Sequence, residues 1–235
     1  MNIDDPTIVA LREKVRTAQE VFEMAVTLHE LWKPAAQDKE LHKRLGVSYA
    51  TQGFNVVRVA LRREMVLAPM RLWDNDPRAI GMQSIAKTLG NQAVIQALVA
   101  DRTSRMNISG VDDEIRRTLR QQADEVIALA SQYADDNVKA ASLKKLRTLR
   151  NQRLAHTQVK AKSFTAADAI DAEIQAFYAD NARLIAILPS LVGGVAYDPA
   201  DLAGVYGYYA SFFWASVRGE KTEGHPNYRG AGPGA

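Results

Sequence analysis

The sequence contains no cysteine. This absence excludes disulfide bonds, thiolate zinc sites, iron–sulfur clusters and cysteine nucleophiles. The sequence also lacks an apolar run long enough to cross a bilayer. Its acidic start does not have the positive-then-apolar order of a secretory signal. We therefore expect a cytoplasmic protein that makes no contact with a membrane.

Acidic residues are missing from one segment, residues 137–167, which carries eight basic residues. These are Lys139, Lys144, Lys145, Arg147, Arg150, Arg153, Lys160 and Lys162. The formal net charge of the whole chain is +3, so removing these eight charges leaves −5 for the remainder. The chain is therefore mildly acidic apart from one basic segment, and its overall charge predicts no general affinity for nucleic acids.

Alternating strand patterns, internal repeats and interdomain linkers are also absent, whereas apolar residues recur at helical spacing through most of the chain. Asp5-Pro6 and Asp198-Pro199 are typical helix starts, with a capping carboxylate before a proline. Pro34 and Pro189 should interrupt or end helices. We predict an all-α bundle of long antiparallel helices in a single domain over residues 1–218. The Gly- and Pro-rich residues 219–235 should form a disordered tail.

We expect helices over residues 6–32, 49–73, 82–89, 92–105, 112–133, 137–156, 166–188 and 199–217, and a short helical piece that ends at Gly46.

An arginine occupies an apolar position in the basic helix. Leu143, Leu146, Arg150 and Leu154 follow each other at steps of three and four residues, so Arg150 falls on the apolar stripe. A buried guanidinium is unfavourable without a partner. Arg150 therefore pairs with a carboxylate, for instance Asp74, reaches an interface, or binds an anion such as phosphate.

His156 lies six residues after Arg150, about 9 Å further along an ideal helix and on a different face. The two side chains converge on one ligand only if the helix end unwinds, or if two copies of the helix face each other across a twofold axis. Asn151 can orient either the histidine or a substrate through its amide group.

The spacing Arg150-Asn151 followed by His156 resembles the Arg-polar-x(3–5)-His signature of the HEPN superfamily. The string from Leu149 to Thr157, and the long helices that close with Arg71-Leu72-Trp73-Asp74, are similar to the AbiU-like abortive-infection branch of that superfamily. The resemblance implies a HEPN-like, homodimeric helical bundle that acts as a metal-independent endoribonuclease of phage-defence or toxin–antitoxin type.

In such a site, the resemblance gives catalytic roles to Arg150, Asn151 and His156. His156 would be the general base or acid at the ribose 2′-hydroxyl or the leaving oxygen, Arg150 would stabilise charge on the scissile phosphate, and Asn151 would position the histidine or the phosphate. RNA contact is assigned to Lys144, Lys145, Arg147 and Arg153, although these side chains could also be simply solvated. No metal or other cofactor is expected, because no His-Glu-x-x-His motif or Asp/His cluster occurs.

Two other functions remain open at this stage. One is a non-catalytic HEPN-like module that binds RNA, a nucleotide or a protein, and the other is a purely structural helical protein. An antitoxin protein is a further candidate partner. His29 and His42 are interpreted as surface or helix-end residues, and the aromatic residues between Tyr206 and Trp214 as core or subunit interface, with base stacking as the alternative.

Overall fold

The computed structural model describes the whole chain except residues 1–4, 75, 77–78, 107–109, 150–166 and 230–235, and the side chains of 167–171. Its described residues form helices and contain no strand, as predicted. In chain order the helices are α1 (Pro6–Gln37), α2 (Lys39–Leu45), α3 (Tyr49–Arg71), α4 (Met82–Leu89), α5 (Gln92–Met106), α6 (Asp112–Ser131), α7 (Ala140–Leu149), α8 (Ala167–Gly193), α9 (Pro199–Ala215) and the short 3-10 helix η2 (Gly219–Lys221).

The helix starts that the sequence marks are confirmed. Helix α1 begins at Pro6, and the backbone N–H of Thr7 donates to Oδ1 of Asp5 at 2.8 Å. Helix α9 begins at Pro199, directly after Asp198. Helix α2 ends at Gly46, which has a positive φ of 51° that favours glycine. Local sequence thus marks the starts of α1 and α9 and the end of α2.

Two proline predictions are wrong. Helix α1 continues through Pro34 to Gln37, and helix α8 continues through Pro189 to Gly193. Residues that follow each proline are buried, Ala35 in one case and Leu191 and Val192 in the other. Packing of the turn after the proline outweighs the loss of one helical hydrogen bond.

The chain divides into two compact units. The first contains residues 1–22 and 67–199, and the second contains residues 23–66 and 200–235. Helices α1 and α3 each contribute residues to both units. The predicted single domain over residues 1–218 and the predicted disordered tail stay predictions.

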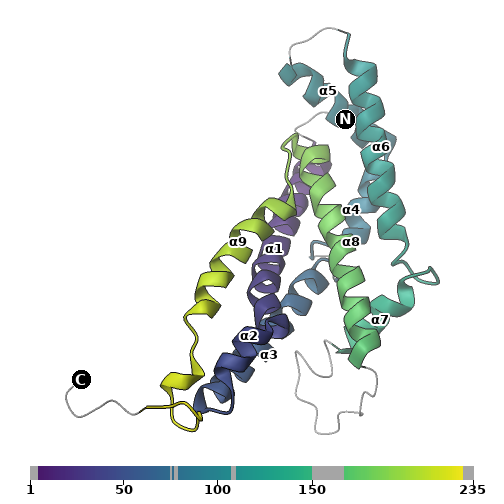
Figure 1. The fold of residues 1–235 in the computed structure, drawn as a ribbon. Helices are drawn as coiled ribbons and strands as arrows, with labels where there is room; N and C mark the ends of the chain where they lie inside the picture. The colour runs from purple at the N-terminus through teal and green to yellow at the C-terminus, as the bar shows by residue number, and fades with distance from the viewer. Residues whose placement is uncertain (1–4, 75, 77–78, 107–109, 150–166, 230–235) are drawn as a thin grey trace. The chain divides into compact units, whose positions relative to one another are not determined.

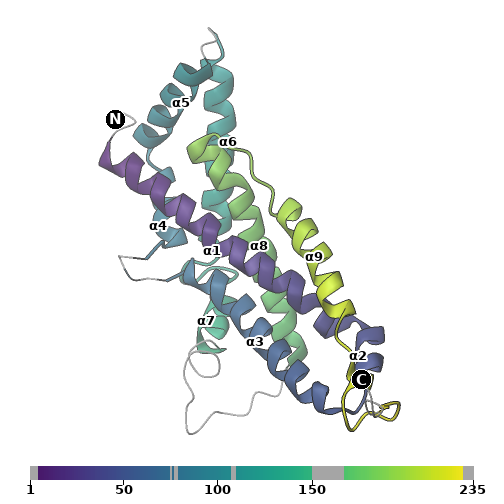
Figure 2. The same ribbon diagram turned by 90° about the vertical axis from the view of Figure 1, so that its left-hand side faces the viewer.

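The first unit is built around helix α6. Helices α4, α5 and α8 pack against α6, and Figures 1 and 2 show α6 running in the opposite direction to both α5 and α8. The predicted apolar stripe of α6 supplies the buried side chains Leu119, Ala123, Val126 and Ala130. Long antiparallel helices are therefore present in this unit, as the sequence predicts.

The second unit has a small core of its own. Trp214 of α9 packs with Ala35, Leu41 and Phe54, which come from α1, α2 and α3. The indole N–H of Trp214 donates to the carbonyl of Leu31 at 2.8 Å. Helix η2 packs against α2. The backbone at Gly219 comes so close to Leu45 that a Cβ there would overlap the carbonyl oxygen of Leu45. Glycine is therefore required where the chain after α9 crosses the end of α2.

The predicted surface or helix-end position is wrong for His29. It is buried in the middle of α1, and its Nδ1 lies 2.9 Å from Oε1 of the buried Glu30. His42 lies in the last turn of α2 as predicted, with Nε2 2.8 Å from the carbonyl oxygen of Ala35. His29 is therefore part of the second unit's interior, whereas His42 is half-buried at the end of α2.

Candidate active site

Helix α7 leads directly into the predicted catalytic motif. Leu143 and Leu146 of this helix are buried, so the first half of the predicted apolar stripe is confirmed. The helix is described as far as Leu149, one residue before the motif begins. Arg150, Asn151, Arg153 and His156 themselves lie outside the described residues.

Arg147 attaches α7 to the segment that ends α3. Its Nη2 donates to the carbonyl oxygen of Trp73 at 2.7 Å. Trp73 belongs to the sequence Arg71-Leu72-Trp73-Asp74, which the resemblance to AbiU-like proteins singles out. A side-chain-to-backbone hydrogen bond therefore joins α7, two residues before Leu149, to the Arg71–Asp74 segment. Arg147 was assigned to RNA contact, and this hydrogen bond gives it a structural role as well.

Trp73 also belongs to an aromatic cluster with Tyr133 and Phe177. The ring of Trp73 is 4.6 Å from that of Tyr133 and 6.0 Å from that of Phe177, measured between centroids. The indole N–H of Trp73 donates to Oδ1 of Asn181 at 2.8 Å, and Nδ2 of Asn181 donates to the carbonyl of Phe177 at 2.7 Å. Asn181 is fully buried, so this fixed amide sets the orientation of the tryptophan.

The buried role of Asn181 was not predicted from the sequence. A signal was present, because Asn181 lies four residues after Phe177 and three before Leu184, on the apolar stripe of α8. A polar residue at such a position implies a buried hydrogen-bond partner. The partner itself was not predictable, since Trp73 is 108 residues away in the sequence.

Tyr133, Lys139 and Asp180 form an ionic cluster beside the aromatic residues. The Tyr133 hydroxyl donates to Oδ2 of Asp180, and Nζ of Lys139 binds the same oxygen at 2.5 Å. The ammonium of Lys139 also lies 5.5 Å from the centre of the Tyr133 ring. Burial, together with the negative charge of Asp180, raises the pKa of the Tyr133 phenol above its ordinary value. This phenol therefore acts as a fixed hydrogen-bond donor at neutral pH.

The three described lysine and arginine side chains assigned to RNA have different surroundings. Lys145 is paired with Glu173 at 2.6 Å, and Arg147 binds the Trp73 carbonyl. Lys144 is exposed, and within the described part of the chain it forms no ion pair. It lines a hollow beside α7 together with Arg147, Asp135 and Asp136. Lys144 is therefore the described side chain of α7 best placed to meet an anion.

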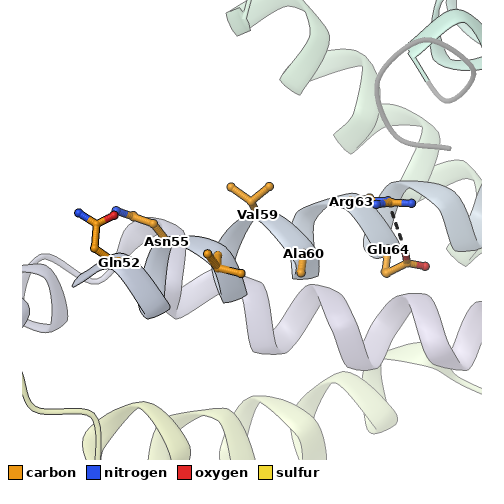
Figure 3. A pocket seen from close by; sticks show the side chains of 7 residues that line it. Gln52, Asn55, Val59, Ala60, Arg63 and Glu64 are labelled. Carbon is orange, nitrogen blue, oxygen red and sulfur yellow. Dashed lines mark ion pairs between the residues drawn. The ribbon is translucent and has the colours of Figure 1, made fainter. Parts of the chain in front are cut away.

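A second hollow lies on the outer face of α3, in the second unit. Gln52, Asn55, Val59, Ala60, Arg63 and Glu64 line it, and Figure 3 shows them along one side of the helix. Arg63 and Glu64 are both exposed and are 3.6 Å apart. Among the residues that line this hollow, Glu64 is an acid–base side chain but has no histidine or second carboxylate beside it, so the hollow is a weak catalytic candidate.

No three His, Asp or Glu side chains of the described part of the chain gather closely enough to hold a metal ion. None of the helices described combines the length and apolar character needed for a bilayer span.

Comparison with protein families places the chain in a class. Residues 8–213 match the HEPN family AbiU2, and this match covers most of the sequence. The class is that of all-α HEPN modules, which agrees with the helical fold described above. The chain belongs to the AbiU2 family of HEPN proteins. No curated protein and no solved structure matches it.

Proposed function

We propose that this chain is a metal-independent endoribonuclease of the phage-defence or toxin–antitoxin type. The observation that carries the proposal is membership of the AbiU2 family over residues 8–213, in a sequence that has Arg150-Asn151 and His156 at HEPN spacing. Its substrate is RNA in the cytoplasm. A homodimer places two copies of the motif in one cleft, and an antitoxin protein is the partner in the toxin–antitoxin form.

The reaction needs only groups that the chain and RNA possess. His156 removes the proton from a ribose 2′-hydroxyl, and the resulting oxygen attacks the adjacent phosphorus. The bond to the 5′-oxygen of the next nucleotide breaks, and that oxygen takes up a proton. Arg150 binds the phosphate oxygens on which negative charge increases, a contact that suits a guanidinium. Asn151 positions the histidine or the phosphate. DNA lacks the 2′-hydroxyl and is not cut by this route.

The surroundings of α7 support the placement of this motif. Leu143 and Leu146 attach the helix to the core, and Arg147 attaches it to Trp73. The chain thus enters residue 150 from a helix that is fixed on two sides, which favours a preorganised site. Lys144 adds a positive charge on α7, six residues before Arg150 in the sequence.

The test is RNA cleavage in the presence of EDTA. We expect the wild-type chain to cut RNA, and His156→Ala to lower the rate by about 10² to 10⁴, the usual contribution of a general acid or base. His225→Ala is the matched control, because His225 lies in the residues after α9 and far from the motif in sequence. Its rate should equal that of the wild type.

A wild type that does not cut RNA, or a His156→Ala variant that cuts it equally well, would contradict the catalytic proposal. If the wild type binds RNA but does not cut it, with or without a partner removed, the chain is a binding module. In that case His156→Ala leaves binding intact, whereas Arg150→Ala weakens it in a salt-dependent manner.

A further inference from the structure

The first half of α3, in the second unit, exposes aliphatic side chains to solvent. Val56 is 70% exposed and Val59 is 63% exposed, although both lie in the interior of a helix of 23 residues. They belong to the hollow of about 490 Å³ whose lining Figure 3 shows. β-branched side chains lower the stability of a solvated helix, so valines at these positions favour packing against a further surface.

The exposed residues of this face are spaced like the seam of a pair of helices. Five residues follow each other at steps of three, four, three and four, which is the alternation of positions a and d in a coiled-coil heptad. They are Tyr49, Gln52, Val56, Val59 and Arg63, and we call them the α3 seam. Its centre is aliphatic and its ends are polar. A stripe of this width matches one further helix.

Small residues beside the α3 seam leave room for the backbone of a second helix. Gly53 and Ala60 are exposed, and each lies one position after a d residue of the seam. A Cβ built on Gly53 would have no atom within 4 Å, so no contact in the described part of the chain requires glycine there. Glycine in a helix interior lowers stability, whereas it permits a partner helix to come close.

The face around the α3 seam is positively charged. No aspartate or glutamate occurs from Gly46 to Arg63, a stretch that contains Arg58 and Arg62 as well. Glu64 lines the hollow 3.6 Å from Arg63, so three arginines and one glutamate leave a net charge of +2. Arg62 lies at heptad position g, which contacts the flanking residues of a partner helix. Acidic flanks on that helix complement the charge of this face.

The side chains of the α3 seam favour a protein helix over RNA. Binding of single-stranded RNA commonly uses several aromatic side chains on which successive bases stack. In this half of α3, Phe54 is buried and Tyr49 lies at the first position of the helix. Val56 and Val59 occupy the centre, where aliphatic side chains offer neither a stacking surface nor a contact for phosphate. They match the apolar stripe of an amphipathic helix.

We infer that the α3 seam binds an amphipathic helix of a different protein, one with apolar residues along its contact stripe and acidic residues on both flanks. The inference goes beyond the proposed function, because it concerns the second unit and requires no RNA cleavage. A chain that binds such a helix and cuts no RNA would contradict the proposed function alone.

Binding of two synthetic helical peptides to the full chain tests this inference. Both peptides carry leucine at positions a and d over about three heptads, and they differ only in having glutamate or lysine at positions e and g. Fluorescence anisotropy measures each affinity. We expect the glutamate peptide to bind at least about tenfold more tightly than the lysine peptide. The double variant Arg62→Glu/Arg63→Glu should reverse this order.

Removal of the aliphatic centre is a second, independent measurement. The double variant Val56→Gln/Val59→Gln should bind the glutamate peptide more weakly by about tenfold or more, as for central apolar residues of an interface. Val57→Gln is the matched control, because Val57 is 41% exposed on the same helix but lies at position b, off the seam. Its affinity should equal that of the wild type.

The inference is wrong if the glutamate peptide does not bind, if the lysine peptide binds equally well, or if the valine double variant binds like the wild type. It is also wrong if Val57→Gln weakens binding as much as that double variant. Sedimentation and RNA binding of the double variant detect other occupants. Loss of a wild-type dimer would assign the α3 seam to a second copy, and loss of RNA affinity would assign it to RNA; either result contradicts the inference.

Far-UV circular dichroism accompanies each variant. Loss of helix in the valine double variant would contradict the exposure of Val56 and Val59, and with it the inference.

Discussion

Polar side chains at apolar helix positions have specific partners in this protein. Asn181 lies on the buried stripe of α8 and binds the indole of Trp73. Arg147 lies at the edge of the buried face of α7 and binds the Trp73 carbonyl. In the sequence, Arg150 follows Leu143 and Leu146 at helical spacing and is predicted to fall on the same apolar stripe. Because the two described cases are both satisfied by hydrogen bonds, we expect Arg150 to have a partner too, and the proposed partner is a phosphate of RNA.

Tyr133 permits a test at the scale of one residue. Its phenol has a raised pKa because it is buried and donates to Asp180. The folded state therefore keeps the proton to higher pH than the unfolded state, whose tyrosine ionises near 10.0. The resulting stabilisation is complete below that pH and is lost as the pH rises above it.

Tyr133→Phe should consequently change the alkaline part of the stability curve. At about pH 8 we expect the variant to be less stable than the wild type by about 1 kcal/mol, through loss of one hydrogen bond. Above about pH 10 the difference in the free energy of unfolding should shrink by up to about 1.4 kcal/mol per pH unit. Only the wild type loses the stabilisation that comes from the raised pKa of Tyr133. Urea unfolding at both pH values measures it. Tyr49→Phe, at a residue 71% exposed, should follow the wild type throughout, and a constant difference for Tyr133→Phe would refute the buried donor.

At the scale of the helix, caps were predictable and proline effects were not. The carboxylate of Asp5 and the glycine at position 46 act on groups within a few residues, so the sequence alone indicates the boundary. Whether a helix continues through Pro34 depends on the burial of Ala35 against residues of α2, α3 and α9. That burial is a property of the folded unit and leaves no local signal.

The uninterrupted course of α1 predicts the effect of Pro34→Ala. Proline in a helix interior removes one backbone donor, so alanine should raise the free energy of unfolding by about 1 kcal/mol after allowance for the more flexible unfolded chain. Pro199→Ala is the control, because proline at the first position of α9 removes no helical hydrogen bond. It should be neutral or slightly destabilising. Thermal unfolding compares the two, and a destabilising Pro34→Ala would mean that the helix ends before residue 34.

The aromatic residues of α9 show how far helical spacing can be interpreted. Their spacing indicates a shared face, and the sequence leaves core, subunit interface and base stacking as alternatives for that face. The structure assigns Trp214 to the core and leaves Tyr208 and Phe212 exposed. Burial of Trp214 depends on Phe54 and Leu41, which are distant in sequence. Periodicity therefore predicted the helix, whereas the division of its residues between core and surface required the tertiary fold.

The uneven charge of the chain predicts which basic residues contribute to the proposed binding of RNA. The basic residues of 137–167 are not equivalent, because Lys139 and Lys145 are paired with Asp180 and Glu173. Lys144 is the described lysine of α7 that has no ion pair in this part of the chain. It should therefore contribute more to RNA binding than the basic count suggests.

Lys144→Ala tests this distribution. We expect weaker RNA binding and a decrease of about one in the slope of log affinity against log salt concentration, the effect of removing about one phosphate contact. Arg16→Ala is the control, since Arg16 lies outside the basic segment and is paired with Glu13 and Glu20. A salt titration of binding to one RNA distinguishes them. Equal losses in both variants would indicate diffuse attraction to the whole surface.

The fold class and the family were predictable from sequence. Helical periodicity gave the all-α class, and the Arg150-Asn151-His156 spacing indicated the HEPN superfamily, which the match over residues 8–213 confirms. The contacts among Trp73, Tyr133 and Asn181 were not predictable, because these residues meet only in the folded unit. The catalytic roles of Arg150, Asn151 and His156 stay predictions.

The central claim is that His156 promotes attack by the RNA's own 2′-hydroxyl. The most direct measurement is the chemistry of the newly formed ends when wild type and His156→Ala act, in EDTA, on one RNA and on the same RNA with 2′-deoxyribose at the cleaved position. We predict a 2′,3′-cyclic phosphate or its 3′-phosphate product from the wild type, little product from His156→Ala, and no cleavage at the deoxy position. Cleavage at the deoxy position, or equal cleavage by His156→Ala, would contradict this account.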